Sequence, residues 1–179
     1  MKIKKELYKA QKYDIVSFDI FDTLIERNVE KPTDIFFQVG VGCFSNYEMA
    51  MDFQKRRIIA EHIARNISKT GEVNLDDIYN ALEGYDFETC KKLKNEEIHT
   101  EINSCYPRSQ IVELFNELKN MGVPLVLISD MYLPKNWSGR SAPFRELSPL
   151  RTVHESFPSY GSSNSKFLYR NRLIISFFY

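Results

Sequence analysis

Two short apolar segments, separated by about 100 residues of helical pattern, limit what this chain can fold into. The first is 14–21, with the sequence DIVSFDIF, and the second is 124–130, with the sequence PLVLISD. Both are short, apolar and flanked by polar residues, so each is predicted to be a buried strand. Continuous apolar runs are typical of a parallel sheet whose two faces are covered by helices. We therefore expect an α/β fold.

The apolar spacing before the second segment predicts a helix. Its apolar face consists of Ile111, Leu114, Phe115, Leu118 and Met121. Gly122 follows as a stop signal, and the second predicted strand begins directly after it. A helix, a glycine and a strand in this order are typical of half a βαβ unit.

A long helix is predicted from about Asn46 to the stop signal at Gly71. Its expected apolar stripe consists of Met49, Phe53, Ala60, Ile63, Ala64 and Ile67. Three arginines lie away from this stripe and are expected on a solvated face; they are Arg56, Arg57 and Arg65.

Two further helices are predicted before the second strand. Asn74, with Asp77 three residues later, resembles a capping pair that begins a helix to about Leu82. A weaker stripe indicates another helix over 87–103. An ordinary connection between two strands of this kind needs only about a dozen residues. The excess predicts a helical insertion over the sheet.

The composition changes after residue 134. Residues 1–134 contain 17 Lys/Arg and 22 Asp/Glu, whereas 135–179 contain 7 and 2, so a net charge of −5 is followed by +5. Serine rises from 6 to 9 between the same two segments. This switch is typical of a domain boundary, a disordered tail or a shifted reading frame. We interpret 135–179 as an atypical tail that is disordered or non-native, and the apolar stretch 167–179 fits a strand or a helix equally well.

The whole chain has 24 basic and 24 acidic residues, and this balance gives no reason to expect nucleic acid or an anionic membrane as a partner. No apolar region follows the basic N-terminus, so no signal peptide is expected. The apolar run near the end is far shorter than the ~20 residues that span a bilayer. Three widely spaced cysteines, Cys43, Cys90 and Cys105, favour reduced thiols and a cytoplasmic location.

Polar residues end both predicted strands. In an open α/β sheet, the carboxyl ends of the strands line the ligand crevice. A carboxylate at this place, as at Asp19, is able to act as a nucleophile, although it also fits an ordinary turn cap. Ser129 ends the second strand, where its hydroxyl is able to bind a phosphoryl oxygen, although a Ser-Asp pair is also a common turn signal.

Together, FDIFDTLIER and LVLISDMYLP resemble a predicted-hydrolase branch of the haloacid-dehalogenase superfamily, some of whose members are linked to glycosyltransferases. The resemblance covers about residues 12–134. It implies a Rossmann-like parallel sheet with a helical cap inserted after the first strand: a core of 1–27 and 104–134, and a cap of 28–103. It also implies a phosphatase-type reaction on a small phosphorylated substrate, an aspartyl-enzyme intermediate and Mg²⁺.

The same resemblance assigns roles to individual residues. Asp19 matches the nucleophile, and the carbonyl of Phe21 matches a backbone ligand that holds Mg²⁺ together with Asp19. Thr23 matches the hydroxyl that supports the loop at the substrate site, and Ser129 matches the phosphate-binding hydroxyl. Arg27, at the entrance to the expected cap, is a candidate contact for an anionic substrate.

The chain departs from the family pattern at the general acid. Phosphatases of the superfamily have an aspartate two residues after the nucleophile, where this chain has Phe21. The acid stands one place later, at Asp22, where many relatives have glycine. General acids contribute typically 10²–10⁴-fold, so this change would restrict substrates to good leaving groups. Haloacid dehalogenases also lack an acid there, and Phe21 therefore leaves the reaction class open.

The later family motifs are weak or missing. After Asp130 the chain has only Glu146 and Glu155, so the acidic pair that completes a Mg²⁺ site is not found. Lys166, in SSNSKFLY, weakly matches the family's lysine and is a candidate substrate-binding residue. We expect a hydrolase of this superfamily with weak or absent phosphatase activity. Two alternatives stay open: a catalytically inactive fragment whose helices form an interaction module, and a metal-independent dehalogenase.

Overall fold

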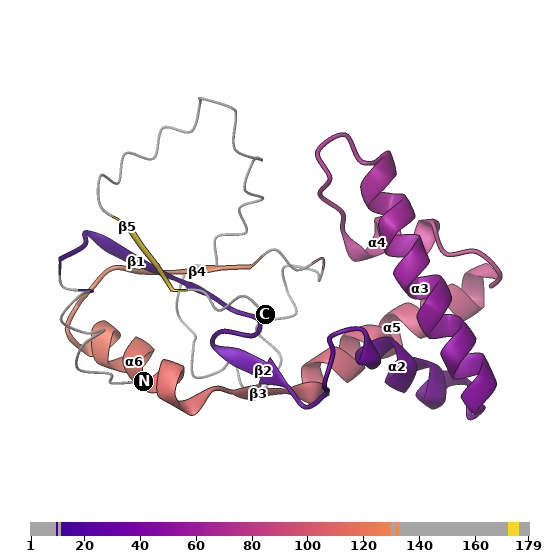
Figure 1. Cartoon of the computed structure of the whole chain (residues 1–179), viewed down its shortest axis with the longest axis horizontal. Coiled ribbons are helices and arrows are strands. Elements are labelled where there is room, and N and C mark those ends of the chain that lie inside the picture. The colour runs from indigo at the N-terminus through magenta and orange to yellow at the C-terminus, as the bar shows by residue number, and fades with distance from the viewer. Residues whose placement is uncertain (1–9, 11, 130–131, 133–171, 176–179) are drawn as a thin grey trace. The chain divides into compact units, whose positions relative to one another are not determined.

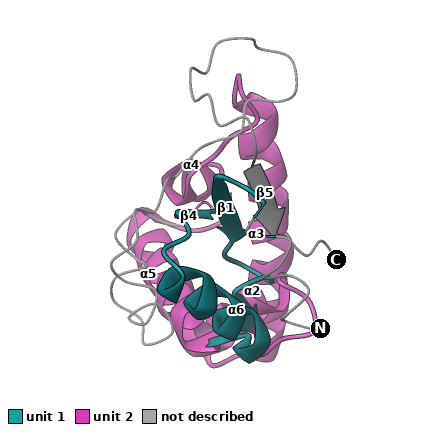
Figure 2. Ribbon diagram, turned by 90° about the vertical axis from the view of Figure 1, so that its left-hand side faces the viewer, with its two compact units in different colours: residues 1–26, 106–130, 143–179 teal, residues 27–105, 131–142 magenta. Residues whose placement is uncertain are grey.

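The computed structural model describes residue 10, residues 12–129, residue 132 and the backbone of 172–175 (Figure 1). These residues form a mixed α/β structure with a small parallel sheet and a larger share of helix. They divide into two compact units (Figure 2). The described residues of unit 1 are 10, 12–26, 106–129 and 172–175, and those of unit 2 are 27–105 and Tyr132.

Among the described residues, the sheet of unit 1 has three parallel strands in the order β4-β1-β5. The central strand β1 (Ile15–Asp19) pairs with β4 (Leu125–Ile128) on one side and with β5 (Arg172–Ile175) on the other. Both strands predicted from the sequence are therefore confirmed. β5 lies in the apolar stretch for which the sequence favoured neither strand nor helix.

The helix α6 (Ser109–Asn120) of unit 1 supplies apolar side chains to the core. Phe115 packs edge-to-face on Phe18 of β1, with 5.2 Å between the ring centroids. The predicted helix and its stop are confirmed: Gly122 has a φ of 73°, and the N–H of Val123 donates to the carbonyl of Leu118 at 3.1 Å. Met121 was wrongly expected on the apolar face, because it caps the helix and is 44% exposed.

The part of unit 2 that the structure describes contains four helices: α2 (Asp34–Phe44), α3 (Tyr47–Ile67), α4 (Leu75–Asn80) and α5 (Phe87–Ser104). The last three are the helices predicted from the sequence, and α2 was not predicted. The side chain of Asn46 accepts the N–H of Met49 at the start of α3, and Asn74 and Asp77 form a reciprocal capping box on α4. Local capping signals thus begin α3 and α4.

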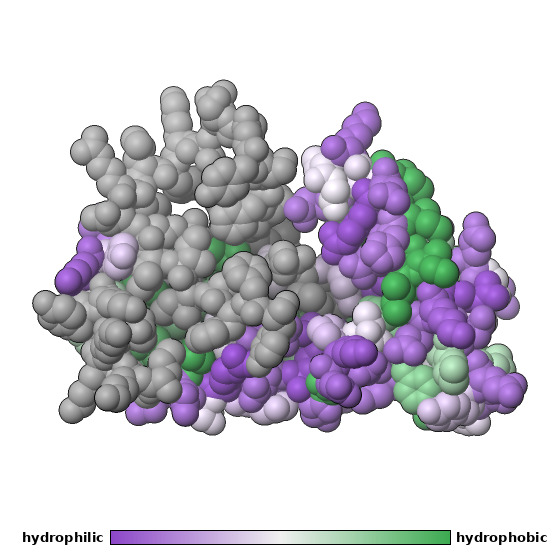
Figure 3. Space-filling model, viewed as in Figure 1, coloured by the Kyte–Doolittle hydropathy of each residue, from purple (hydrophilic) through white to green (hydrophobic). Residues whose placement is uncertain are grey.

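The buried face of α3 differs from the predicted stripe. It consists of Ala50, Phe53, Arg57, Ala60 and Ala64. Arg57, expected on a solvated face, has no exposed surface, whereas Ile67 is 76% exposed. The Ala50 side of the helix is covered by α2, so closely that a Cβ atom on Gly40 would lie 2.6 Å from the Cα of Ala50. Ile59, Ile63 and Ile67 are left exposed, and Figure 3 shows an apolar band along α3.

The strands β2 (Ile25–Arg27) and β3 (Cys105–Pro107), which precede and follow the four helices along the chain, form a two-stranded sheet. The N–H of Asn28 donates to Ser104 at 2.9 Å, and the N–H of Arg108 donates to Leu24 at 2.8 Å. Going from Leu24 to Asn28 on one strand corresponds to going back from Arg108 to Ser104 on the other, so the pairing is antiparallel. The chain thus enters and leaves its helical segment through paired strands.

Candidate active site at the end of the central strand

Asp19 and Ser129 stand at the carboxyl ends of two neighbouring parallel strands. Asp19 is the last residue of β1 and pairs in register with Ile128, the last residue of β4. The N–H of Ile20 donates to the carbonyl of Ile128 at 3.1 Å, and Ser129 follows directly, with 5% of its surface exposed. The predicted parallel pairing of the two strands is therefore confirmed. That the two side chains face one crevice stays a prediction.

The chain turns tightly after Asp19. The carbonyl of Ile20 accepts from the N–H of Leu24 at 2.9 Å and from the N–H of Ile25 at 3.1 Å, which closes a single helix-like turn. Phe21 forms an isolated bridge with Ile25. These backbone hydrogen bonds hold residues 20–25 in one conformation and fix the backbone positions from which their side chains extend.

Thr23 holds the carboxylate of Asp19. Its side chain has no exposed surface, and its Oγ1 donates to Oδ2 of Asp19 at 2.8 Å. A hydrogen bond to a charged acceptor is about twice as strong as one between two neutral groups. The turn that returns the chain four residues later thus orients the candidate nucleophile. This geometry fits the supporting role that the sequence resemblance implied for Thr23.

Asp22 occupies a backbone conformation that glycine adopts freely. Its φ is 55°, in the left-handed region, where a non-glycine residue carries strain on the order of 1 kcal/mol. Many proteins of the superfamily that the motifs resemble have glycine at this position, and a left-handed turn is a physical reason for that preference. Asp22 keeps part of its surface exposed, whereas the neighbouring Phe21 is buried. The only acidic side chain between Asp19 and Thr23 is therefore accessible.

Arg27 belongs to the helical unit. It is 9% exposed, and its Nε donates to Oε2 of the buried Glu101 at 3.1 Å. A role for Arg27 in binding an anionic substrate stays a prediction, and Glu101 is a competing anion for it. Lys166 and Asp130 lie outside the described residues, as do Glu146 and Glu155.

The helical unit contains a buried ionic cluster that the sequence did not predict. The guanidinium of Arg57 bonds both carboxylate oxygens of Glu97, at 2.9 and 2.7 Å, and neither side chain has exposed surface. The hydroxyl of Tyr79 donates to the same carboxylate at 2.8 Å. Burial is the largest single effect and lowers the pKa of Arg57, but the charge of Glu97, its hydrogen bond and the nearby tyrosines together outweigh burial, so this pKa is raised.

A signal for this burial was present in the sequence. Phe53, Arg57, Ala60 and Ala64 are spaced at i, i+4, i+7 and i+11, which is the spacing of one helix face. The arginine was assigned to the solvated side because of its charge. A buried arginine is tolerated where a carboxylate and aromatic rings replace its hydration, and the rings of Phe36 and Tyr132 lie 4.3 and 4.9 Å from its Cζ.

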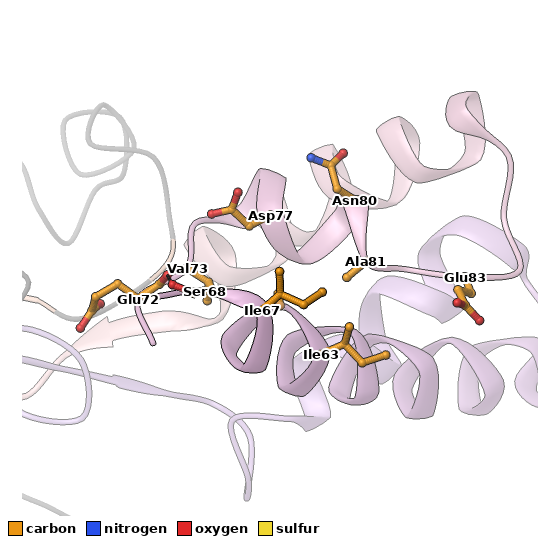
Figure 4. Close-up of a pocket in the computed structure, with 10 residues that line it drawn as sticks. Ile63, Ile67, Ser68, Glu72, Val73, Asp77, Asn80, Ala81 and Glu83 are labelled. Atoms are coloured by element: carbon orange, nitrogen blue, oxygen red, sulfur yellow. Dashed lines mark hydrogen bonds between the residues drawn. The ribbon is translucent and has the colours of Figure 1, made fainter. Parts of the chain in front are cut away.

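A cavity of about 510 Å³ lies between the second half of α3 and α4 (Figure 4). Its walls combine apolar side chains such as Ile63 and Ile67 with the carboxylates of Glu72, Asp77 and Glu83. None of the predicted site residues is among its lining residues. The residues that line the cavity are therefore different from the strand-end residues that carry the candidate chemistry.

The residues near Asp19 do not fit a Mg²⁺ ion by themselves. Mg²⁺ prefers six oxygen ligands in octahedral geometry. In the part of the chain that the structure describes, no three His, Cys, Asp or Glu side chains are grouped so as to hold a metal. Asp19 and the carbonyl of Phe21 would supply two protein oxygens, and no chemical step below is derived through a metal.

Comparison of the sequence with protein-family models and with curated proteins finds no match. Among the helices of the described residues, none combines the length and the apolar character needed to cross a membrane. None of the three cysteines of the chain, Cys43, Cys90 and Cys105, forms a disulfide. The candidate site is thus carried by its own geometry and by the sequence motifs.

Proposed function

We propose that this chain is a hydrolase of the haloacid-dehalogenase type, in which Asp19 attacks a phosphorylated small molecule. The observation that carries the proposal is the pairing of Asp19 with the end of β4, next to Ser129, while Thr23 holds the carboxylate of Asp19. A nucleophile, a neutral phosphate-binding hydroxyl and a supporting hydroxyl are three of the parts that such a reaction uses at one sheet edge.

The remaining architecture supports the same proposal. The resemblance implies a Rossmann-like sheet with a helical cap inserted after the first strand. All three described strands of the larger sheet are parallel, and the helices α2 to α5 lie in the chain between β1 and β4. We assign 27–105 as the cap. We assign the cytoplasm as the place of action, because three widely spaced cysteines favour reduced thiols.

The proposed chemistry has two steps. A carboxylate oxygen of Asp19 attacks phosphorus, the bond from phosphorus to the leaving oxygen breaks, and the leaving oxygen takes a proton. Asp22, partly exposed three residues later, is the candidate donor of that proton. Water then hydrolyses the aspartyl phosphate, releases phosphate and returns a proton to Asp22.

The rate is expected to be low. Hydrolysis of phosphate monoesters is among the slowest uncatalysed reactions, and most of its acceleration comes from electrostatic stabilisation and positioning. The described residues offer one nucleophile and few fixed donors. We therefore expect weak or absent turnover, and only on substrates with good leaving groups.

The test is release of p-nitrophenol from p-nitrophenyl phosphate, with and without Mg²⁺, by the unchanged chain and by Asp19→Asn. Slow turnover that Asp19→Asn abolishes supports the proposal. Turnover that persists in Asp19→Asn contradicts the assigned nucleophile. Robust turnover that Asp19→Asn abolishes would keep the nucleophile and refute the expected impairment.

Two alternatives have observations of their own. The buried, non-acidic Phe21 fits a metal-independent dehalogenase, since a halide leaves without a proton; release of chloride from 2-chloropropionate would separate this reaction from phosphate hydrolysis. The exposed isoleucines of α3 beside the cavity fit an interaction module without catalysis. This second alternative gains support if neither substrate reacts.

A further inference from the structure

The second half of α3 exposes a row of isoleucines. Ile59, Ile63 and Ile67 follow one another at intervals of four residues and are 56%, 37% and 76% exposed. Residues at this spacing form a ridge along one side of a helix, and such ridges pack into the grooves of other helices. With a rise of 1.5 Å per residue, the row is about 12 Å long, or roughly two helical turns. The row therefore has the length of a contact with a short helix.

The cavity of about 510 Å³ makes the surface beside this row concave. Ile63 and Ile67 of α3 line one wall, and Asn80 of α4 and the following Ala81 line the other. We call this surface the α3–α4 groove. A groove between two helices that presents apolar side chains is the setting in which amphipathic helices dock.

The rim of the α3–α4 groove is acidic. Glu72, Asp77 and Glu83 are among its lining residues, and no lysine or arginine is. Figure 4 shows Ile63 and Ile67 between Glu72 at one end and Glu83 at the other. The groove therefore combines an apolar middle with a carboxylate at each end.

The carboxylates at the two ends are not neutralised by the protein itself. In the part of the chain that the structure describes, no ion pair involves Glu72 or Glu83. The exposed Arg56 and Arg65 of α3 instead bond carboxylates of the same helix, at 2.6 and 2.8 Å. A ligand that complements this groove therefore carries positive charge at both ends of an apolar stripe.

We propose that the α3–α4 groove binds a short amphipathic helix of a partner protein, with a lysine or arginine at each end of its apolar stripe. The isoleucines supply the apolar contact, which gives most of the affinity. Glu72 and Glu83 pair with the two basic ends, and exposed charges of this kind set the register and the association rate more than the affinity. The same carboxylates disfavour an anionic membrane surface as the occupant. The proposal does not depend on the proposed hydrolysis, because neither Asp19 nor Ser129 lines the groove.

The probe is a fluorescein-labelled peptide of about 15 residues, with leucines at the spacing of one helix face, alanines between them and lysines at both ends. One comparison peptide has glutamates in place of the lysines. A second has the same composition, with the leucines redistributed around the helix. Fluorescence anisotropy with the full chain should show saturable binding of the probe and at least about tenfold weaker binding of both comparison peptides.

A matched pair of variants tests the apolar row. Ile67→Ala removes most of an exposed side chain of the groove, and we expect the probe to bind about tenfold more weakly. Met49→Ala is the control, because Met49 is 45% exposed near the start of α3 and does not line the groove. It should change the affinity by less than about twofold. Both side chains are exposed, so neither change removes a core contact.

A second pair of variants tests the acidic ends. Changing Glu72 and Glu83 together to lysine should weaken binding of the probe about tenfold at low salt, and this difference should shrink as the salt concentration rises. Glu48→Lys is the control, because Glu48 is exposed at the start of α3 and lies outside the groove. It should bind the probe as the unchanged chain does.

The proposal would be overturned if Ile67→Ala bound the probe as tightly as the unchanged chain, or if the glutamate peptide bound as tightly as the probe. Sedimentation tests the rival occupant, a second copy of this chain. A dimer that Ile67→Ala converts to a monomer would show that the groove is covered by a second copy, which would also overturn the proposal. Asp19→Asn should bind the probe normally, so loss of hydrolysis and loss of docking are separate results.

Discussion

The hydroxyl of Thr23 donates a hydrogen bond of 2.8 Å to the carboxylate of Asp19, four residues earlier in the chain. The bond closes over a turn in which Asp22 takes a left-handed conformation. A free carboxylate would rotate about its side-chain bonds. Here one oxygen is held, and the proposed nucleophile is oriented before a substrate arrives.

Replacing Thr23 by valine should remove this bond at nearly constant volume. Because the hydroxyl is fully buried and its acceptor is a carboxylate, we expect the free energy of unfolding to fall by about 1.5–3 kcal/mol. Thr23→Ser keeps the hydroxyl and serves as the control, with a smaller loss from the missing methyl group. Urea denaturation measures both. Equal losses in the two variants would show that the hydroxyl contributes little.

Arg57 and Arg56 are neighbours in α3 with opposite surroundings, and they give a matched pair. Arg57→Met leaves the buried Glu97 without its cation, so we expect a loss of about 3–5 kcal/mol in the free energy of unfolding. Arg56 is 44% exposed in its side chain and pairs with Asp52 within the same helix. Arg56→Met should change stability by less than about 0.5 kcal/mol. Similar effects in chemical denaturation would contradict the buried cluster.

Gly40 and Gly42 lie two residues apart in α2 and differ in the space around them. A Cβ atom on Gly40 would meet the backbone of Ala50 at 2.6 Å, and we expect Gly40→Ala to destabilise the protein by about 1–3 kcal/mol. A Cβ atom on Gly42 would meet the flexible end of Glu96 at 3.2 Å. Gly42→Ala should be neutral or should stabilise the helix by up to about 1 kcal/mol. Thermal unfolding of the two variants checks that Gly40→Ala is the less stable one. If Gly42→Ala were the less stable variant, this packing of α2 on α3 would be refuted.

Asp86 gives a prediction about acid pH. Its side chain accepts the N–H of Thr89 at 2.7 Å at the start of α5, and this bond lowers its pKa below the ordinary 3.8. Between the lowered pKa and 3.8, the unfolded chain binds more protons than the folded chain, so stability rises with pH. The contribution is complete above 3.8 and is lost as the pH falls through the lowered value.

Asp86→Asn tests this prediction, because asparagine also caps helices but does not titrate. The stabilities of the variant and the unchanged chain should differ in their pH dependence between about pH 2 and 5 and should run parallel near pH 7. Urea denaturation across this range is the measurement. Identical acid profiles would show that Asp86 does not cap α5.

The elements that were predicted from sequence have local signals. The strands β1 and β4 are continuous apolar runs, α6 has a clear apolar spacing and a glycine stop, and Asn74 with Asp77 begins α4. Each of these signals lies within or directly beside the element that it predicts. Local periodicity and capping chemistry therefore sufficed for these elements.

The elements that were not predicted depend on residues far away in the chain. The helix α2 contains Gly40 and Gly42, which weaken helical propensity, and its close packing on Ala50 compensates. β5 is a strand because β1 offers it a free edge. The burial of Arg57 depends on Glu97, which comes 40 residues later. In the candidate site, the strand ends were predicted, but the left-handed conformation of Asp22 was not.

Phosphorylation of Asp19 is the most direct test of the central claim, because the aspartyl phosphate forms before water hydrolyses it. The chain is incubated with p-nitrophenyl phosphate, quenched in acid and digested with trypsin. The peptide 13–27 then contains Asp14, Asp19 and Asp22 and is sequenced by mass spectrometry. The account predicts the added mass of one phosphoryl group on Asp19, its loss in Asp19→Asn and its retention in Asp22→Asn. A phosphoryl group on another residue, or turnover without any on Asp19, would contradict the account.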